Sequence, residues 1–203
     1  MRLFLLGATG SVGTQLIDQG LERGHQVTAF VRSPQKIRPR PNLSVIAGDL
    51  LDSDQLKRAL PGHDAVISTL GHAKGGPPTV VADGARTTVA AMRATGPRRL
   101  LVISVAFLFP EAGLAGKIIG NLLFSSVVKD HREMERTVSQ SGLDWTILRP
   151  PRFTNGPRTE RYRVADGHLP PRGFTISRAD LAHFTLLEAE QGAHIGKIVG
   201  IGY

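Results

Sequence analysis

The chain contains 203 residues, of which 25 are Lys or Arg and 17 are Asp or Glu, so its formal net charge is +8. Hydrophobic residues make up 41% of the sequence and charged residues 21%, which is too apolar for a disordered chain and sufficient for one globular domain. Cysteine is absent, which excludes disulfide bonds, thiolate nucleophiles and zinc-thiolate sites.

No segment is both long and apolar enough to direct the chain to a membrane. The N-terminal apolar run covers only residues 3–6, which is too short for the core of a signal peptide. A second apolar region, at 100–128, is interrupted before about 20 apolar residues accumulate. The interrupting residues are Pro110, Glu111, Lys117 and Asn121. We therefore expect a buried strand, an apolar loop and a helix in this region, and a cytoplasmic protein without a membrane partner.

Seven short apolar runs predict β-strands. They cover residues 2–6, 26–31, 43–47, 65–70, 100–104, 146–148 and 197–201. Most of these runs are apolar throughout, which is typical of strands buried on both faces by helices packed against a parallel sheet.

Helical segments alternate with these strands. Apolar residues recur at helical spacing over 12–21, 80–92 and 134–138, and Ser53 is expected to cap another short helix. This alternation predicts the α/β class, with a doubly wound parallel sheet, the Rossmann fold, in a single NAD(P)-binding domain over residues 1–203. Residues 150–178 break the alternation because they are rich in Pro, Gly and Arg, so we expect an irregular substrate-side flap there.

The turn between the first strand and the first helix has glycines at the spacing of a dinucleotide-binding site. Its residues are Gly7, Ala8, Thr9, Gly10, Ser11, Val12 and Gly13. The first glycine permits a tight turn, the second lets the backbone approach a pyrophosphate, and the third lets the helix pack closely. Free N–H groups and the helix dipole would then face the phosphates. The alternative is a glycine-rich turn without a ligand.

The end of the second strand indicates which dinucleotide is bound. NAD-binding sites usually place a carboxylate there to accept hydrogen bonds from the ribose, whereas this chain has Arg32 followed by Ser33. A guanidinium can hold a 2′-phosphate, so we expect NADP (NADPH) in preference to NAD. A solvated surface charge is the alternative interpretation of Arg32.

Further candidates for cofactor binding follow the next three strands. They are Asp49 and Leu50 after the third strand, Thr69, Leu70 and Gly71 at the fourth, and Ser104 at the fifth. The Asp49 carboxylate could accept a hydrogen bond from an adenine amino group. Gly71 leaves room for the ribose, and the Ser104 hydroxyl could face the nicotinamide or the substrate. Each also has a structural alternative, namely capping a turn, ending a strand or bonding to backbone.

The catalytic residues are harder to assign. Short-chain reductases pair a Tyr with a Lys four positions later, but neither Tyr162 nor Tyr203 is followed by such a lysine. The helix after the fifth strand instead contains Lys129 and His131. His131 could donate a proton near neutral pH, and Lys129 could hold an anion or the ribose. Exposed charges on a helix surface are the alternative. No metal site is expected.

Several segments together resemble a known family. The glycine turn and residues 31–33, 48–50 and 141–150 are similar to the NAD(P)-binding, atypical short-chain dehydrogenase/reductase family that includes the NmrA-like proteins. The later segments, 104–109, 130–134, 150–151 and 176–184, are most similar to its biliverdin reductase B group of NADPH-dependent flavin reductases. The sequence departs from that pattern between Pro110 and Ser126.

The resemblance implies hydride transfer from NADPH to a conjugated acceptor such as a flavin, a quinone-like compound or a linear tetrapyrrole. It implies that Ser104 contacts the nicotinamide or substrate, that His131 lies at the wall of the site, and that Phe107, Pro151 and Arg152 contact the substrate. An NmrA-like redox sensor that binds NADP without catalysis is the alternative function. Sugar-nucleotide epimerisation ordinarily needs the tyrosine that this chain lacks.

Two remaining features concern residues 149–178. Ser177 is expected to cap the following helix, where only Arg178 could reach a ligand. The segment has seven arginines against Glu160 and Asp166, which predicts a basic rim that attracts a small anionic substrate. Replacing Arg158, Arg161 and Arg163 should then raise KM for anionic acceptors. The basic residues carry no nucleic-acid-binding signature, so no nucleic-acid partner is expected.

Overall fold

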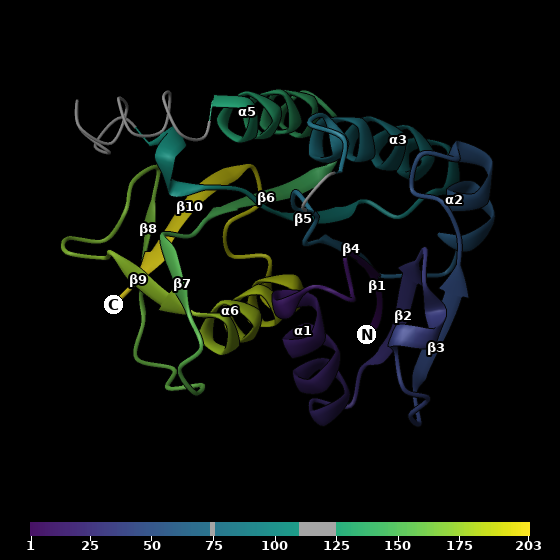
Figure 1. Ribbon diagram of the computed structural model, residues 1–203, viewed down its shortest axis with the longest axis horizontal. Coiled ribbons are helices and arrows are strands. Elements are labelled where there is room, and N and C mark those ends of the chain that lie inside the picture. Colours follow the sequence, from purple (N-terminus) through teal and green to yellow (C-terminus); the bar gives the residue numbers. More distant parts are fainter. Residues whose placement is uncertain (74–75, 110–124) are drawn as a thin grey trace.

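The computed structural model describes residues 1–73, 76–109 and 125–203. Its centre is an eight-stranded sheet of order β3-β2-β1-β4-β5-β6-β10-β8, parallel except for β8, which pairs antiparallel with β10 (Figure 1). The strands are β1 (Arg2–Leu6), β2 (Gln26–Val31), β3 (Leu43–Ala47), β4 (Ala65–Ser68), β5 (Arg99–Ile103), β6 (Asp144–Arg149), β8 (Arg163–Asp166) and β10 (Lys197–Gly202).

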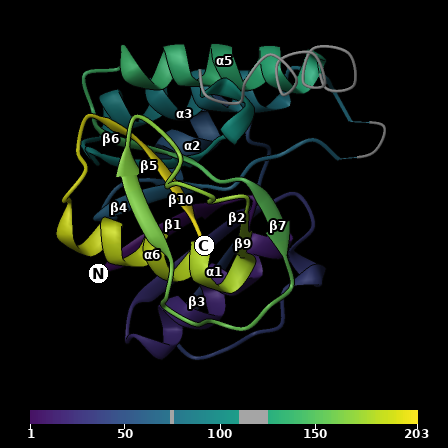
Figure 2. The same cartoon turned by 90° about the vertical axis from the view of Figure 1, so that its left-hand side faces the viewer.

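Helices cover both faces of this sheet (Figures 1 and 2). One face is covered by α1 (Ser11–Glu22) and α6 (Arg178–Gln191), and the other by α2 (Ser53–Ala59), α3 (Val80–Thr95) and α5 (Ser125–Ser139). Alternate residues of β1 supply the two cores, because Leu3 and Leu5 pack with α1 and α6 whereas Phe4 and Leu6 pack with the other three helices. The predicted α/β class and doubly wound Rossmann sheet are confirmed.

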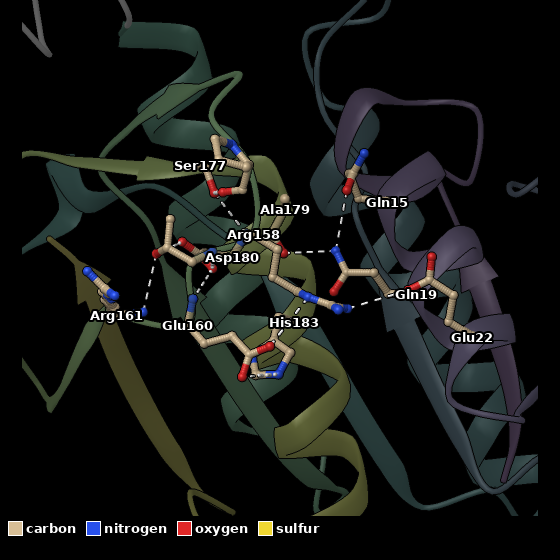
Figure 3. A network of polar contacts seen from close by, with 12 residues as sticks. Gln15, Gln19, Glu22, Arg158, Glu160, Arg161, Ser177, Ala179, Asp180 and His183 are labelled. Carbon is tan, nitrogen blue, oxygen red and sulfur yellow. Dashed lines mark hydrogen bonds and ion pairs between the residues drawn. The ribbon is translucent and has the colours of Figure 1, made fainter.

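The segment 150–178 contains three short strands. Besides β8, they are β7 (Arg152–Thr154) and β9 (Thr175–Ser177), which pair with each other in a separate two-stranded parallel sheet. The chain between β7 and β8 is held against α6 by Asp180 (Figure 3). The Asp180 carboxylate accepts hydrogen bonds from the backbone N–H of Thr159 and of Glu160, both at 2.8 Å.

Helix starts agree with the predictions in one case and differ in another. The Ser177 hydroxyl accepts from the N–H of Asp180 at 2.9 Å, so Ser177 caps α6 as expected. The predicted Ser53 cap is wrong, because the Asp52 side chain accepts hydrogen bonds from the N–H groups of Asp54 and Gln55, so Asp52 is the N-cap and Ser53 is the first residue of α2.

Residues 110–124 of the expected apolar loop lie outside the described residues. Among the helices that the structure describes, none has the length and apolarity to cross a membrane.

Candidate cofactor and active site

A cavity of about 750 Å³ lies at the carboxyl ends of the parallel strands, where open α/β sheets bind their ligands. Its volume is within the range of roughly 300–1,000 Å³ that is usual for small-molecule sites. Every strand from β1 to β5 contributes a residue at or just after its end: Leu6, Val31, Gly48, Thr69 and Ser104. The cavity therefore extends across the point at which the strand order reverses.

The glycine turn has the close contacts that its sequence predicts. Gly7 has φ +79°, and a Cβ there would lie 2.7 Å from the hydroxyl oxygen of Thr69. A Cβ on Gly13 would collide with the carbonyl oxygen of Gly7 and with the backbone of Ala8. Gly7 is required by its positive φ and its contact with Thr69, and Gly13 because the first helical turn packs directly against the end of β1.

The N-terminus of α1 can accommodate a phosphate. Gly10 is the N-cap and makes no side-chain cap, so the N–H groups of the first helical turn remain without an intrahelical partner. A Cβ on Gly10 would meet only the carbonyl oxygen of Gly7, at 3.2 Å, which leaves space beside these donors. Ser11 and Val12 of this turn line the cavity, as does Thr9. This geometry fits the pyrophosphate of a dinucleotide.

Two cations lie at the end of β2. Arg32 is exposed and lines the cavity together with Ser33 and Lys36. Lys36, at the end of the short 3₁₀ helix η1 (Pro34–Lys36), was not singled out from the sequence, although its spacing from Arg32 is the signal that could have found it. Neither cation has an ion-pair partner among the described residues, so both are available to a phosphate group.

The other predicted cofactor residues line the cavity, but some have structural roles as well. The Thr69 hydroxyl donates to the carbonyl oxygens of Leu6 and Gly7 at 3.2 and 3.1 Å, which holds the glycine turn against β4. Asp49 accepts from the N–H of Leu51 at 3.0 Å, as its turn-capping alternative predicted. Leu50, Leu70 and Gly71 complete the middle of the cavity.

Ser104 is buried at the far end of the cavity and is already bonded. Its hydroxyl donates to Glu135 Oε1 at 2.5 Å, and Glu135 also accepts two hydrogen bonds from the Arg149 guanidinium, at 2.9 and 2.5 Å. No local pattern predicts this network, because the three residues come from separate elements.

His131 is only 5% exposed and lines the cavity, so the interpretation as an exposed surface charge is wrong for this residue. Its Nδ1 lies 2.9 Å from the carbonyl oxygen of Val127, which requires a hydrogen on Nδ1. Burial lowers the pKa of His131 below its ordinary value and outweighs the hydrogen bond to Val127, which raises it. The ring is therefore neutral at neutral pH, and Nε2 is a hydrogen-bond acceptor.

Lys129 and Asp130, the neighbours of His131, point to different surroundings. Lys129 is exposed and is absent from the described lining of the cavity. Asp130 is buried, and its carboxylate accepts from the N–H groups of Val81 and Ala82 at 3.0 Å each, so it satisfies the N-terminus of α3. The cavity also contains His72, which the sequence did not single out.

The expected substrate-contacting residues do not line the described cavity. Phe107, in the 3₁₀ helix η2 (Ala106–Leu108), is 42% exposed, and Arg152 is exposed at the start of β7. Pro151 is half-buried beside it. The lining residue is Phe153, since successive side chains of a strand point to opposite faces. Arg178 lies over the Phe153 ring at 5.3 Å from its centroid.

Most of the predicted basic rim is not at the cavity; Arg178 is an exception, because it donates a hydrogen bond at 2.9 Å to the hydroxyl oxygen of Ser11, which lines the cavity. None of the seven arginines from 149 to 178 belongs to its described lining. Arg158 instead lies 3.4 Å from Glu22, at the end of α1 opposite the glycine turn (Figure 3). Both tyrosines are also elsewhere: Tyr162 bonds to His183 Nδ1 at 2.7 Å, and Tyr203 donates to Asp180 at 2.5 Å.

Comparisons with known proteins agree with this geometry. A family model described as NAD(P)H-binding matches residues 7–191. A protein of known structure from Burkholderia pseudomallei is 30% identical, has a TM-score of 0.87 and covers the whole of both chains. A Rossmann-fold NAD(P)-binding family protein from Shigella flexneri is 26% identical over 99% of this chain and 92% of its own, with a TM-score of 0.78.

A third relative has an enzymatic name. The (4-alkanoyl-5-oxo-2,5-dihydrofuran-3-yl)methyl phosphate reductase of Streptomyces griseus is 30% identical over 74% of this chain and 48% of its own length. The match of the family model over most of the chain confirms the resemblance drawn from the sequence motifs. The chain belongs to the NAD(P)H-binding family of Rossmann-fold proteins.

Proposed function

We propose that the protein is an NADPH-dependent reductase that transfers hydride to a conjugated acceptor such as a flavin, a quinone-like compound or a linear tetrapyrrole. The observation that carries the proposal is the extent of the cavity, which runs from Arg32 and the N-terminus of α1 to Ser104, His131 and Phe153. It provides one end for a phosphorylated adenosine and another for a planar reactant.

The residues around the cavity have distinct tasks in this proposal. The N–H groups at the start of α1 would bind the pyrophosphate, and Arg32 and Lys36 would bind the 2′-phosphate. The bound nicotinamide would supply the hydride. His131 Nε2 would accept a hydrogen bond from the carboxamide or ribose, since its ring is neutral.

The acceptor would lie between apolar residues at the far end. Ile103, Val105, Val127 and Phe153 line this part of the cavity and can pack against both faces of a planar ring. Phe153 lets the substrate-side segment 150–178 contribute to the site. Stacking and orientation would then supply most of the rate, without the tyrosine-lysine pair. The reductase name of the Streptomyces griseus relative supports this reaction class.

Oxidation of NADPH by the purified protein tests the proposal. The absorbance at 340 nm is followed with a panel of flavins, quinones and biliverdin, and NADH serves as the comparison cofactor. We expect turnover with at least one acceptor and a lower KM for NADPH than for NADH. Tight NADPH binding without turnover on any acceptor would refute the reductase function.

A redox sensor of the NmrA-like kind is the second candidate. The observation that favours it is the engagement of the hydroxyl groups, because Ser104 donates to Glu135 and both tyrosines bond outside the cavity. Such a sensor should bind NADP⁺ and NADPH with different affinities and retain a protein partner during purification. Equal affinities and no partner would exclude it.

A cytoplasmic location is also part of the proposal. It rests on the cysteine-free sequence, which requires no oxidising compartment. Fractionation of cells that express the protein with a C-terminal tag would test it, and recovery from the periplasm or a membrane would overturn it.

A further inference from the structure

His72 pairs with the buried Asp130 carboxylate at the edge of the cavity. Its Nε2 lies 2.9 Å from Asp130 Oδ2 and 3.1 Å from the carbonyl oxygen of Pro78. The Asp130 side chain is only 2% exposed and is fixed by its two hydrogen bonds from the N-terminus of α3. The Pro78 carbonyl, which accepts the hydrogen bond from Nε2, and the Asp130 carboxylate beside it therefore hold the imidazole together in a defined orientation.

The surroundings of His72 determine its tautomer. A carboxylate and a carbonyl oxygen can only accept hydrogen bonds, so Nε2 must carry a hydrogen. Nδ1 has no hydrogen-bond partner among the described residues. The side chain is 21% exposed and lines the cavity. Nδ1 is consequently the nitrogen that can exchange a proton with solvent or with a bound molecule.

His131 is the complement of His72. The two rings lie 5.7 Å apart, and both line the cavity. His131 holds its hydrogen on Nδ1 toward Val127 and is kept neutral by burial, whereas His72 has the Asp130 carboxylate to balance an imidazolium charge. Asp130 and His131 are the titratable groups that contact His72 in the described structure. Of the two histidines, His72 is the one arranged to carry a proton.

We propose that His72, oriented by Asp130, is the catalytic proton donor of the reductase. This inference rests on the proposed function. The acceptor gains a hydrogen and two electrons with the hydride, while the cofactor becomes oxidised, and the reduced acceptor then carries one additional negative charge. The donor is the imidazolium form of His72, which carries a hydrogen on each ring nitrogen: the N–H bond at Nδ1 breaks, its proton goes to the acceptor, and the neutral imidazole that keeps its hydrogen on Nε2 takes a new proton from solvent.

Two substitutions separate this role from a structural one. His72→Gln keeps an N–H donor within reach of Asp130 but removes the ring nitrogen Nδ1, and His72→Ala removes both. A proton donor contributes typically 10²–10⁴-fold to rate, so we expect kcat to fall at least about 100-fold in both variants. NADPH affinity, measured by fluorescence titration, should change less than about twofold, and imidazole in solution should restore part of the activity of His72→Ala only.

His63→Gln is the matched control. His63 lines a separate cavity at the amino ends of the strands, together with Arg2 and Thr28, at the edge of the sheet opposite the candidate site. Its substitution should leave kcat unchanged. Near-normal activity in His72→Gln alongside low activity in His72→Ala would show that His72 has only a structural role and would overturn the proposal.

Long-range ¹H–¹⁵N NMR of the ligand-free protein provides a readout that needs no activity. We expect neutral His72 in the Nε2–H tautomer and neutral His131 in the Nδ1–H tautomer. An Nδ1–H tautomer for His72 would overturn the proposal whatever the enzyme reduces. Absence of turnover in the unmodified protein would refute the reductase and the donor role together, whereas full activity of His72→Gln would refute the donor role alone.

Discussion

Cofactor selectivity depends on individual residues at the end of β2. Arg32 and Lys36 are separated by one turn of 3₁₀ helix and face the same cavity without a carboxylate between them. A 2′-phosphate there would accept charge-assisted hydrogen bonds, which contribute roughly 1.5–3 kcal/mol each. NADH lacks that phosphate and would gain nothing from either cation.

Arg32→Ala should therefore raise the dissociation constant of NADPH by about 10- to 100-fold, which corresponds to the loss of one charge-assisted hydrogen bond to the 2′-phosphate. The affinity for NADH should change less than about twofold. Isothermal titration calorimetry with both cofactors measures the two effects, and Arg38→Ala is the control because Arg38 is exposed but absent from the described cavity lining. An equal loss for NADH and NADPH would contradict the assigned 2′-phosphate contact.

At the scale of elements, Asp180 connects the substrate-side segment to α6. Besides the backbone of Thr159 and Glu160, its carboxylate accepts from the hydroxyls of Thr159 at 2.7 Å and Tyr203 at 2.5 Å. Burial alone would raise the pKa of Asp180, but hydrogen bonds from Tyr203, Glu160 and Thr159 outweigh it and lower the pKa below its ordinary value of 3.8. One carboxylate thus joins the segment before β8, the start of α6 and the C-terminal residue.

Asp180→Asn should destabilise the protein at pH 7 by about 1–3 kcal/mol, because an amide cannot accept all of these hydrogen bonds. Since the folded protein has the lower pKa, the ionised carboxylate contributes stability above about pH 4, and this contribution is lost as the pH falls further. Urea unfolding measured from pH 7 to pH 3 should show that the difference in the free energy of unfolding between the unmodified protein and Asp180→Asn becomes smaller below about pH 4.

Asp166→Asn is the control for this measurement. Asp166 forms an exposed ion pair with Lys197, and such pairs contribute only about 0–1 kcal/mol. A destabilisation by Asp180→Asn that stays constant down to pH 3 would contradict the assigned role of its charge.

At the scale of the whole molecule, two arginines of the predicted basic rim lie away from the candidate site. Arg158 pairs with Glu22 at the C-terminal end of α1, and Arg163 belongs to β8 at the edge of the sheet. The 12 residues of α1 span about 18 Å, which is roughly twice the Debye length at physiological salt. Charges beyond the far end of α1 are therefore largely screened from the cavity.

The triple variant Arg158→Gln, Arg161→Gln, Arg163→Gln should accordingly leave KM for an anionic acceptor within about twofold of its original value at 0.15 M salt. This expectation replaces the rise in KM that the arginine count alone predicts. Steady-state kinetics with flavin mononucleotide as acceptor, alongside uncharged riboflavin as the control, would measure it. A roughly fivefold rise in KM for flavin mononucleotide, without a rise for riboflavin, would contradict this prediction and support a basic rim that attracts anionic acceptors.

Much of the fold and half of the candidate site follow from local sequence. The strand runs and the glycine turn depend on side-chain alternation, chain reversal and close helix packing, which are properties of consecutive residues. The cavity is lined by predicted positions that each follow a parallel strand, because such strand ends meet at one edge of the sheet: Gly7, Thr9, Gly10, Ser11, Val12, Arg32, Asp49 and Thr69.

The remaining features depend on contacts between residues distant in sequence, so only the tertiary structure decided them. His72 meets Asp130, Ser104 meets Glu135, and Arg158 meets Glu22 only after the sheet has assembled. Strand alternation likewise directs Phe153 rather than Arg152 into the cavity, and that choice depends on how β7 packs. Sequence by itself thus determined the nucleotide-binding framework, whereas packing decided which side chains face the acceptor, because spacing along the chain does not specify those long-range pairings.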